Sequence, residues 1–367
     1  MEGKTAMLDH TGPEHTGKDH PGRGRLEHAP ADHPAIAPAK VGVLLVNLGT
    51  PGGTDYWSVR RYLAEFLSDQ RVIDTPSWRW QPILQLIVLT KRPFSSGAAY
   101  RRIWNETLDE SPLLTTTRNQ TAKLRQRLEA RYGGGVVVDF CMRYGNPSTD
   151  AAIRRLQAQG CDRILFLPLY PQYSAAATAT ANDHAFRTLM KLKWQPAIRT
   201  APAYYDHPAY IAALAASVTR AYAALDQRPD LLVTSYHGVP QRYLTEGDPY
   251  HCQCQKTSRL LREKLGFAPD QMVVTFQSRF GVEDWLQPYT VEEVARLAQG
   301  GRKRIAILAP GFSSDCLETL EEIDGEIRES FLNAGGEEFT YIPCLNDSAA
   351  HIDMIETIVE REAAGWL

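Results

Sequence analysis

The sequence predicts an α/β protein made of two Rossmann-like domains, each a four-stranded parallel sheet flanked by helices. Three observations lead to this fold class. Eight short apolar runs recur along the 367 residues, amphipathic helix-like stretches separate most of them, and one run reappears in similar form 141 residues later. Alternation of buried strands with helices is typical of doubly wound folds.

The expected strands are continuous apolar runs that stop at glycine, proline or polar residues. Parallel strands are covered on both faces, so they show no polar alternation. The runs are Val41–Gly49, Val136–Met142, Ile164–Leu169, Ile198–Ala203, Leu231–Tyr236, Val273–Gln277, Ile305–Leu308 and Phe339–Ile342. Eight runs supply four strands for each half of the chain.

An internal repeat supports two similar halves. The segments 163–174 and 304–315 each begin Arg-Ile, continue as an apolar strand and end in polar residues suited to starting a helix. The connection between the first two strands differs in length between the halves: 86 residues separate Gly49 from Val136, whereas 33 separate Gly238 from Met272. The first half therefore carries an insertion, which we place at about residues 51–115.

The domain plan follows from these boundaries. We expect a disordered tail over 1–40, a first domain over 41–205, a second over 206–344 and a C-terminal helix over 345–367. The tail holds five of the ten histidines but has no apolar periodicity. Their irregular spacing does not favour a metal site. No apolar core of a secretory signal is present near the start.

Composition narrows the class of protein. A net charge of −3, with 43% hydrophobic and 23% charged residues, is that of a globular protein and gives no reason to expect a nucleic-acid partner. The six cysteines are scattered, so a disulfide framework is not expected. These features predict a cytoplasmic protein, with peripheral contact at the inner face of the membrane as an addition.

The run Leu231–Tyr236 ends in His237, followed by Gly238. Ligands of open α/β sheets bind at the carboxyl ends of the strands, so His237 is a candidate ligand, acid or base in a cleft between the two sheets. A purely structural, hydrogen-bonded histidine is the alternative.

Acidic residues follow the seventh strand. Ser313 or Ser314 would cap a helix with Asp315 in its first turn. At about 100° per residue, one helix face would carry acids and the opposite face apolar residues. The acids are Asp315, Glu318, Glu322, Glu326 and Glu329. Stacked carboxylates repel unless they attract cations or protons, so Glu318, nearest the cleft, is a candidate site residue and the distal acids are expected to be solvated.

The insertion differs from the rest of the chain. It contains Trp78, Trp80 and Trp104, and the run Ile83–Leu89 followed by the cations Lys91 and Arg92. Seven apolar residues are too few to cross a bilayer, which takes about 20. An exposed apolar lip that contacts membrane and a flat substrate, or a helix buried in the first domain, both fit the pattern.

Several motifs together resemble the ferrochelatase family, the terminal enzymes of haem synthesis. The similarity runs from about Val43 to Ser348 and includes Asn47–Pro51, Tyr170–Ser174, Ser235–Pro240, Gly247–Tyr250, Phe276–Arg279 with Trp285, and Phe312–Leu320. The resemblance implies two Rossmann-like domains around a porphyrin cleft, the class II chelatase arrangement. It also implies insertion of ferrous iron into a distorted porphyrin with loss of two pyrrole protons.

The resemblance also assigns residues. His237 matches the histidine on one side of the macrocycle, as metal ligand or proton acceptor, and Glu318 matches the glutamate on the other, 81 residues later. Asp315 and Glu322 would form an acidic path behind Glu318. Arg101 and Arg102 match a basic pair near the propionates. Further matches to pocket positions are Arg143, Tyr144, Tyr173, Gln277, Trp285 and Phe312.

The expected partners are porphyrin and ferrous iron, with protoporphyrin IX as substrate. Coproporphyrin III and a non-catalytic haem or metal carrier are the alternatives, and the oligomeric state is open. Animal relatives hold a [2Fe–2S] cluster in a cysteine-rich tail, whereas the last cysteine here is Cys344. Cys252 and Cys254 supply only two neighbouring thiols, and a cluster needs four ligands, so no cofactor beyond the substrate iron is expected.

Overall fold

A computed structural model describes residues 32, 39–281 and 283–367. The predicted tail, residues 1–40, lies almost wholly outside the described residues. Residues Pro38–Leu367 form one compact unit. Within it are two four-stranded sheets in the orders β2-β1-β3-β4 and β6-β5-β7-β8, and every strand pair is parallel. The predicted fold class is therefore confirmed.

The first sheet is built on β1 (Lys40–Thr50), which lies between β2 (Val136–Gly145) and β3 (Cys161–Pro168), with β4 (Ala197–Thr200) at the edge. In the second sheet β5 (Leu231–His237) takes the same position between β6 (Met272–Gln277) and β7 (Arg304–Leu308), with β8 (Glu338–Ile342) at the edge. All eight strands coincide with the apolar runs of the sequence. Equivalent order in the two sheets is the structural form of the internal repeat.

Helices connect the strands and cover the sheets. Those of the first half, after the insertion, are α4 (Pro112–Tyr132), η2 (Gly133–Gly135), α5 (Thr149–Ala158), η3 (Ala175–Ala179) and α6 (Thr180–Met190). The later ones are α7 (Pro208–Ala223), α8 (Gln241–Thr245), α9 (Tyr250–Leu265), η4 (Pro269–Gln271), α10 (Thr290–Gln299), η5 (Glu318–Ile327), α11 (Arg328–Asn333) and α12 (Ala349–Glu362). Side-chain caps start several of them: Ser111, Ser148 and Ser348 each accept a hydrogen bond from a backbone N–H of the first turn.

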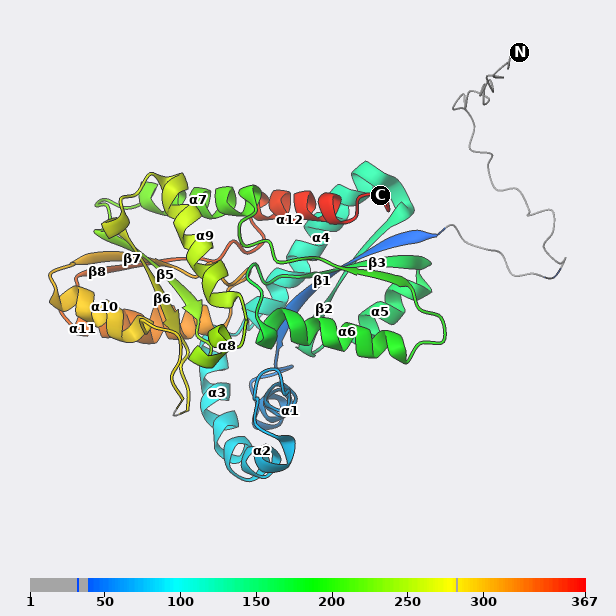
Figure 1. Ribbon diagram of the computed structural model, residues 1–367, viewed down its shortest axis with the longest axis horizontal. Helices are drawn as coiled ribbons and strands as arrows, with labels where there is room; N and C mark the ends of the chain where they lie inside the picture. The colour runs from blue at the N-terminus through cyan, green and yellow to red at the C-terminus, as the bar shows by residue number, and fades with distance from the viewer. Residues whose placement is uncertain (1–31, 33–38, 282) are drawn as a thin grey trace, which may run out of the picture. The chain divides into compact units, whose positions relative to one another are not determined.

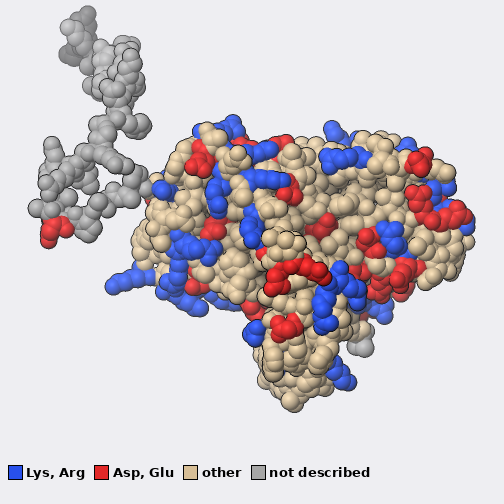
Figure 2. All heavy atoms as spheres, turned by 180° about the vertical axis from the view of Figure 1, so that it is seen from behind, with Lys and Arg blue, Asp and Glu red and all other residues tan. Residues whose placement is uncertain are grey.

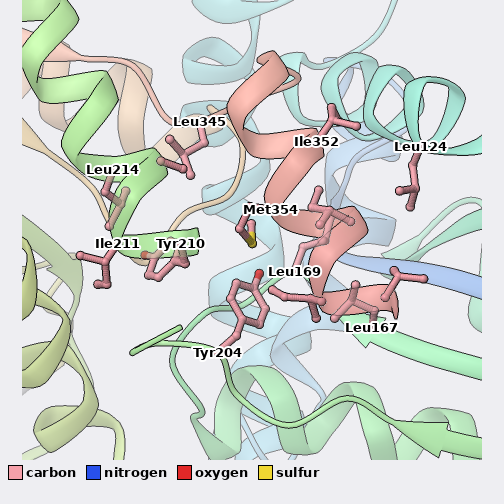
Figure 3. Packing of buried hydrophobic residues seen from close by; sticks show 14 of the residues in the cluster. Leu124, Leu167, Leu169, Tyr204, Tyr210, Ile211, Leu214, Leu345, Ile352 and Met354 are labelled. Atoms are coloured by element: carbon pink, nitrogen blue, oxygen red, sulfur yellow. The ribbon is translucent and has the colours of Figure 1, made fainter. Parts of the chain in front are cut away.

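A single apolar core joins the two sheets. Buried side chains of α4, α7 and α12 pack with residues of both sheets, among them Leu124, Leu214 and Ile358. Figure 3 shows this packing, with Tyr204 and Met354 between the helices. Because both sheets contribute to this core, the core fixes the position of the carboxyl end of β1 relative to that of β5. The boundary at residue 205 stays a prediction.

The insertion forms a helical projection below the sheets in Figure 1. It consists of α1 (Tyr56–Leu67), α2 (Ser77–Ile83), η1 (Leu84–Val88) and α3 (Leu89–Ile103). Asp55 caps α1 by accepting hydrogen bonds from the backbone of Trp57 and Ser58. Among the described helices, none combines the length and hydropathy that a membrane crossing requires.

The projection is buried on one side and apolar on the other. Leu84 and Leu89 are fully buried, whereas Leu86 and Ile87 are 74% and 56% exposed. Trp78 is also exposed, but Trp80 is half-buried and donates a hydrogen bond to the carbonyl oxygen of Leu67 at 2.6 Å. Both sequence interpretations therefore hold in part, because the same short run supplies core contacts and an exposed apolar surface. We call the whole projection, from α1 to α3, the lip.

Candidate active site

His237 is the last residue of the central strand β5. The six residues before it are buried, whereas His237 itself is half-buried. Its Nδ1 lies 2.7 Å from the carbonyl oxygen of Gly238. A carbonyl can only accept, so Nδ1 carries the hydrogen and the neutral ring keeps its lone pair on Nε2. That nitrogen is thus available to accept a proton or to bind a metal.

Gly238 lets an aromatic ring pack against the end of this strand. A Cβ at this position would lie 2.9 Å from the carbonyl oxygen of Gln277 and 3.1 Å from Cε3 of Trp285. Trp285 is buried and meets Phe280 edge to face, with ring centroids 4.7 Å apart. The glycine after His237 is therefore needed for close packing, and it places Trp285 beside the histidine backbone.

Gln277 connects the two strand ends to the acidic helix. It pairs with His237 in the β5–β6 ladder. Its Nε2 donates to the backbone oxygen of Glu318 at 2.8 Å and to the carboxylate of Glu322 at 3.2 Å. Its Oε1 accepts a hydrogen bond of 2.6 Å from Ser235. One buried amide thus brings His237, Glu318 and Glu322 into the same site.

Glu322 is held from the same side by Ser278. The Ser278 backbone N–H donates to Glu322 at 2.7 Å, and its hydroxyl donates to the other carboxylate oxygen. Ser278 has φ of +66°, a left-handed conformation that is uncommon for a residue with a side chain. Such backbone strain occurs where surrounding contacts over-determine the geometry. Here the left-handed backbone of Ser278 lets its N–H and its hydroxyl both donate to the Glu322 carboxylate.

The electrostatics of Glu322 reflect its burial. Burial raises the pKa of Glu322 above its ordinary value, although the hydrogen bonds from Ser278 and the nearby His237 oppose that rise. The adjacent Glu318 carboxylate raises the Glu322 pKa further. Three ionisable groups therefore influence one another at this point, an arrangement suited to moving protons.

The start of the acidic helix differs from the sequence prediction. We predicted a cap at Ser313 or Ser314 with Asp315 in the first turn, and this is wrong: the helix begins after Cys316, and the regular η5 starts at Glu318. The Ser313 hydroxyl instead donates to the carbonyl oxygen of Leu169 at 2.7 Å. The Ser314 hydroxyl accepts from Gln120 at 3.0 Å. Both hydroxyls are therefore hydrogen-bonded to residues distant in the sequence, and neither caps the helix.

Asp315 is part of this anchoring rather than of an open acidic face. Its carboxylate accepts hydrogen bonds from the Tyr341 hydroxyl, from the Cys344 backbone N–H at 3.1 Å and from the Asn346 side chain at 2.7 Å. The residue is buried. Asp315 therefore fixes the segment that leads into Glu318.

The acidic stripe also has a different geometry, because η5 is a π-helix. Bonding from residue i to i+5 gives wider turns than an α-helix, so the 100° spacing does not apply. Glu318 and Glu322 are half-buried, whereas Glu326 and Glu329 are exposed. The solvated state predicted for the distal acids is confirmed.

Glu318 faces a pocket formed with the first half of the chain. Its lining includes the end of β1 at Gly49 and Thr50, two tyrosines of the lip helices, Tyr62 and Tyr100, and Glu318 itself. Burial raises the pKa of both tyrosines, and the nearby Glu318 carboxylate adds to the rise. The pocket wall opposite the acid is therefore aromatic and uncharged.

The two arginines of α3 have different surroundings. Arg102 forms an ion pair with Glu321 of η5, which ties the lip to the acidic helix. Arg101 is exposed at the same helix end. Of the two arginines, Arg101 is therefore the better candidate to bind an anionic ligand, because the guanidinium of Arg102 already pairs with a carboxylate.

Arg143 and Tyr144 lie behind the pocket wall. Arg143 forms a buried ion pair with Asp69 and donates to Thr180 at 2.7 Å. Tyr144 is fully buried, and its hydroxyl donates to the same Asp69 carboxylate at 2.9 Å. Asp69 follows α1, and Thr180 begins α6. Through Asp69, the two residues of β2 therefore join the lip to the first sheet.

Tyr173 and Phe312 have surroundings of their own. Tyr173 lines a solvent-open hollow with Arg71, Tyr243 and Asp248. Phe312 is half-buried and packs against the core of the second sheet. The structure thus brings together His237, Gln277, Trp285, Glu318 and Glu322.

Sequence reasoning missed three residues. Ser278 was seen only as part of a motif; its place directly after a parallel strand was the available signal. Tyr62 and Tyr100 carry no such signal, because an aromatic residue on an amphipathic helix usually belongs to a core.

The cysteines are placed in several environments. Cys252 is exposed, whereas Cys141, Cys161, Cys254, Cys316 and Cys344 are buried. Across residues 39–281 and 283–367, no three Cys, His, Asp or Glu side chains are grouped as a metal site. The question of a cluster therefore stays a prediction.

Comparison with known proteins identifies the family. The ferrochelatase family model matches residues 40–363. A ferrochelatase of Rhodobacter capsulatus is 66% identical over 93% of this chain and 98% of its own length. A ferrochelatase of Agrobacterium fabrum is 58% identical over 93% of this chain and 99% of its own length.

A solved structure supports the fold. SirB from Bacillus subtilis with Fe3+ has a TM-score of 0.51 at 14% identity, covering 89% of this chain and 97% of SirB. At this identity the likeness shows the two-sheet architecture alone. The family match over nearly the whole described chain, with curated relatives of 56–66% identity, shows that the chain belongs to the ferrochelatase family, the porphyrin metal chelatases.

Proposed function

We propose that the protein inserts ferrous iron into protoporphyrin IX to form protohaem, with His237 and Glu318 as the reacting side chains. The observation that carries this assignment is the double hydrogen bond of Gln277, which holds Glu318 and Glu322 next to the strand end that bears His237. A base and a carboxylate at one site suit a reaction in which a metal enters and protons leave.

His237 is assigned the removal of pyrrole protons. Each turnover replaces two pyrrole N–H hydrogens of the porphyrin by one Fe2+, so two protons are released. A neutral imidazole whose Nδ1 carries the hydrogen can accept a proton on Nε2. The Nδ1 hydrogen bond to Gly238 presents that nitrogen. Tyr250 steadies the same residue by donating to its backbone oxygen at 3.0 Å.

Glu318 is assigned the opposite side of the macrocycle, where it steers Fe2+ or carries protons away. Carboxylates suit divalent iron, and two protein ligands are too few for a permanent site, as a substrate metal requires. Glu322, with its raised pKa, is the next proton carrier behind Glu318. Asp315 supports the segment and is not a carrier, because its oxygens are already bound.

Porphyrin binding would rest on apolar contact and on one arginine. Tyr62 and Tyr100, both buried, line the pocket that Glu318 faces and would back the apolar surface against which porphyrin packs. Arg101 is exposed beside it and is assigned to a propionate, because a guanidinium pairs well with a carboxylate. Arg143 and Tyr144, which are buried, would support the pocket wall rather than touch the substrate.

Peripheral membrane contact is assigned to the lip. Trp78, Leu86 and Ile87 expose apolar surface, and Lys91 and Arg92 follow in the same segment. A bilayer would supply a porphyrin reservoir next to the pocket. Iron and porphyrin are substrates here, and we propose that no iron–sulfur cluster is required.

Steady-state metallation under anaerobic conditions tests the activity. Protoporphyrin IX and coproporphyrin III are compared with Fe2+, and a higher kcat/KM for protoporphyrin is expected. A strong preference for coproporphyrin would overturn the substrate assignment, and binding of porphyrin without metallation of either would indicate a carrier. Visible absorbance of the anaerobically purified protein, before porphyrin is added, tests for a cluster.

A further inference from the structure

The carboxyl end of α6 carries an exposed apolar group that the active site does not use. Phe186 and Met190 on α6, and Trp194 just beyond it, are 44%, 80% and 55% exposed. The opposite face of α6 is buried against the first sheet through Ala181, Ala185 and Leu189. Large apolar side chains that cluster on a surface indicate an interaction site more strongly than scattered ones do.

The exposure of Trp194 is built into an ordered turn. Gln157 of α5 donates to the Trp194 backbone oxygen at 2.9 Å. Gln195 donates to the Leu189 backbone oxygen at 2.9 Å, which closes the turn onto α6. The turn is therefore tied on both sides, and the indole is held outward by the backbone.

Cations surround this apolar group. Arg187, Lys191 and Lys193 are exposed, and we call these three with Phe186, Met190 and Trp194 the α6 patch. The nearby acids Asp150 and Asp183 are already paired, with Arg154 and with Arg71 and Arg187. In the part of the chain that the structure describes, Lys191 and Lys193 have no carboxylate within ion-pair distance. Figure 2 shows the molecule from behind, where lysine and arginine side chains lie among acidic ones over the half that holds the first sheet.

The chemistry of the α6 patch matches an anionic lipid surface. Met190 and Trp194 project outward, as side chains that enter a bilayer interface do, and tryptophan with lysine or arginine is the usual interfacial combination. The lip has the same composition. The Arg71–Asp183 ion pair, 3.0 Å long, joins the loop after α1 to α6. In Figure 1, α6 runs along the lower edge of this half and the lip projects on the same side.

We propose that the α6 patch is a second contact with anionic phospholipid, which acts together with the lip. A single shallow apolar contact gives weak, reversible binding, and a second, cationic contact makes it stable. The two contacts would hold the lip side of the protein toward the bilayer. This proposal rests on the membrane contact proposed for the lip, but it concerns binding alone and not the assigned activity.

Vesicle co-sedimentation of the full chain tests it. The probes are vesicles of phosphatidylcholine alone and of phosphatidylcholine with phosphatidylglycerol. Wild type should bind the anionic vesicles more tightly, and salt should weaken that binding. Lys191→Glu/Lys193→Glu should reduce the partition constant on the order of tenfold or more, because each cation near an anionic surface contributes a several-fold effect. Met190→Ser/Trp194→Ser should also reduce it, because apolar burial at the interface is lost.

Matched surface variants control for changes unrelated to lipid. Leu332→Ser on α11, where Leu332 is 39% exposed, and Lys264→Glu on α9, where Lys264 is also exposed, should bind like wild type. Thermal unfolding establishes that all variants fold. Wild-type binding in both patch variants, with binding lost only in Leu86→Ser/Ile87→Ser, would overturn the proposal. A dimeric wild type whose patch variants are monomeric in sedimentation velocity would instead assign the surface to a second copy of the chain.

Discussion

Gln277 donates a hydrogen bond of 2.8 Å from Nε2 to the backbone oxygen of Glu318. The donor stands at the end of β6, next to His237 in the ladder, and the acceptor begins the π-helix η5. This bond therefore sets how the acidic helix meets the strand that carries the histidine.

Replacing Gln277 by leucine should lower both activity and stability. The change keeps the volume but removes the donors to Glu318 and Glu322 and the acceptor for Ser235. We expect kcat to fall about tenfold to a hundredfold with a smaller change in the porphyrin KM, since such supporting partners commonly have effects of that size. The free energy of unfolding should fall by about 1–3 kcal/mol, because buried polar groups lose partners.

Gln172→Leu is the matched control for that loss of stability. Gln172 is also buried, and its Nε2 donates to Thr257 at 3.0 Å. The control should lower stability without the tenfold loss in kcat. An equal fall of kcat in both variants would show that Gln277 acts only through stability.

His237 and Glu318 should differ in their effects on the reaction. His237→Ala should reduce metallation by about 10²–10⁴-fold, the range for loss of a general base, while porphyrin still binds in a fluorescence titration. Glu318→Gln keeps shape but removes charge, so its loss should vary between Fe2+ and Zn2+. His251→Ala, at a half-exposed histidine on α9, is the control and should stay within about twofold of wild type. Near-normal activity of His237→Ala would remove the imidazole from the mechanism.

Glu322 should make stability depend on pH in a defined direction. Burial raises its pKa in the folded state above the ordinary value of 4.5. The folded state therefore holds the proton more tightly than the unfolded state, so this group's contribution to stability is fully present below pH 4.5 and is lost as pH rises through the folded-state pKa. The stability of Glu322→Gln relative to wild type should increase over that interval.

Chemical unfolding of wild type and Glu322→Gln at several pH values measures this difference. Lost hydrogen bonds with Ser278 and Gln277 shift the whole curve of the variant but do not change its slope with pH. Parallel curves for the two proteins above pH 4.5 would show that the pKa of Glu322 is not raised.

Substitutions on the exposed and the buried face of the lip should have different effects on vesicle binding and on stability. Leu86→Ser and Ile87→Ser, at exposed positions, should weaken vesicle binding and change stability by no more than about 0.5 kcal/mol. Leu84→Ser and Leu89→Ser, at fully buried positions, should cost about 2–5 kcal/mol of stability. Circular dichroism melts and co-sedimentation measure the two effects. Loss of stability without any change in lipid binding for Leu86→Ser would mean that the lip only packs.

Much of the architecture is a local property of the chain. The eight strands follow from continuous apolar runs, because a strand covered on both faces needs apolar residues at every position. His237 could be placed at a ligand-binding edge because it directly follows the apolar run Leu231–Tyr236, and in the structure it is the first half-buried residue after six buried ones. The order of motifs then indicated the family, and the family match confirms it.

Long-range contacts decided the remaining features, and local pattern does not contain them. Ser313 and Ser314 look like helix caps, but Leu169 and Gln120 use their hydroxyls, and Asp315 is bound by Asn346 and the Cys344 backbone. The helix therefore begins only after Cys316, because hydrogen bonds from distant segments outweigh a local cap. Likewise Leu84 and Leu86 are apolar residues of one run, separated only by Gln85, and only packing against α1 and the end of β2 determined that Leu84 is buried and Leu86 is exposed.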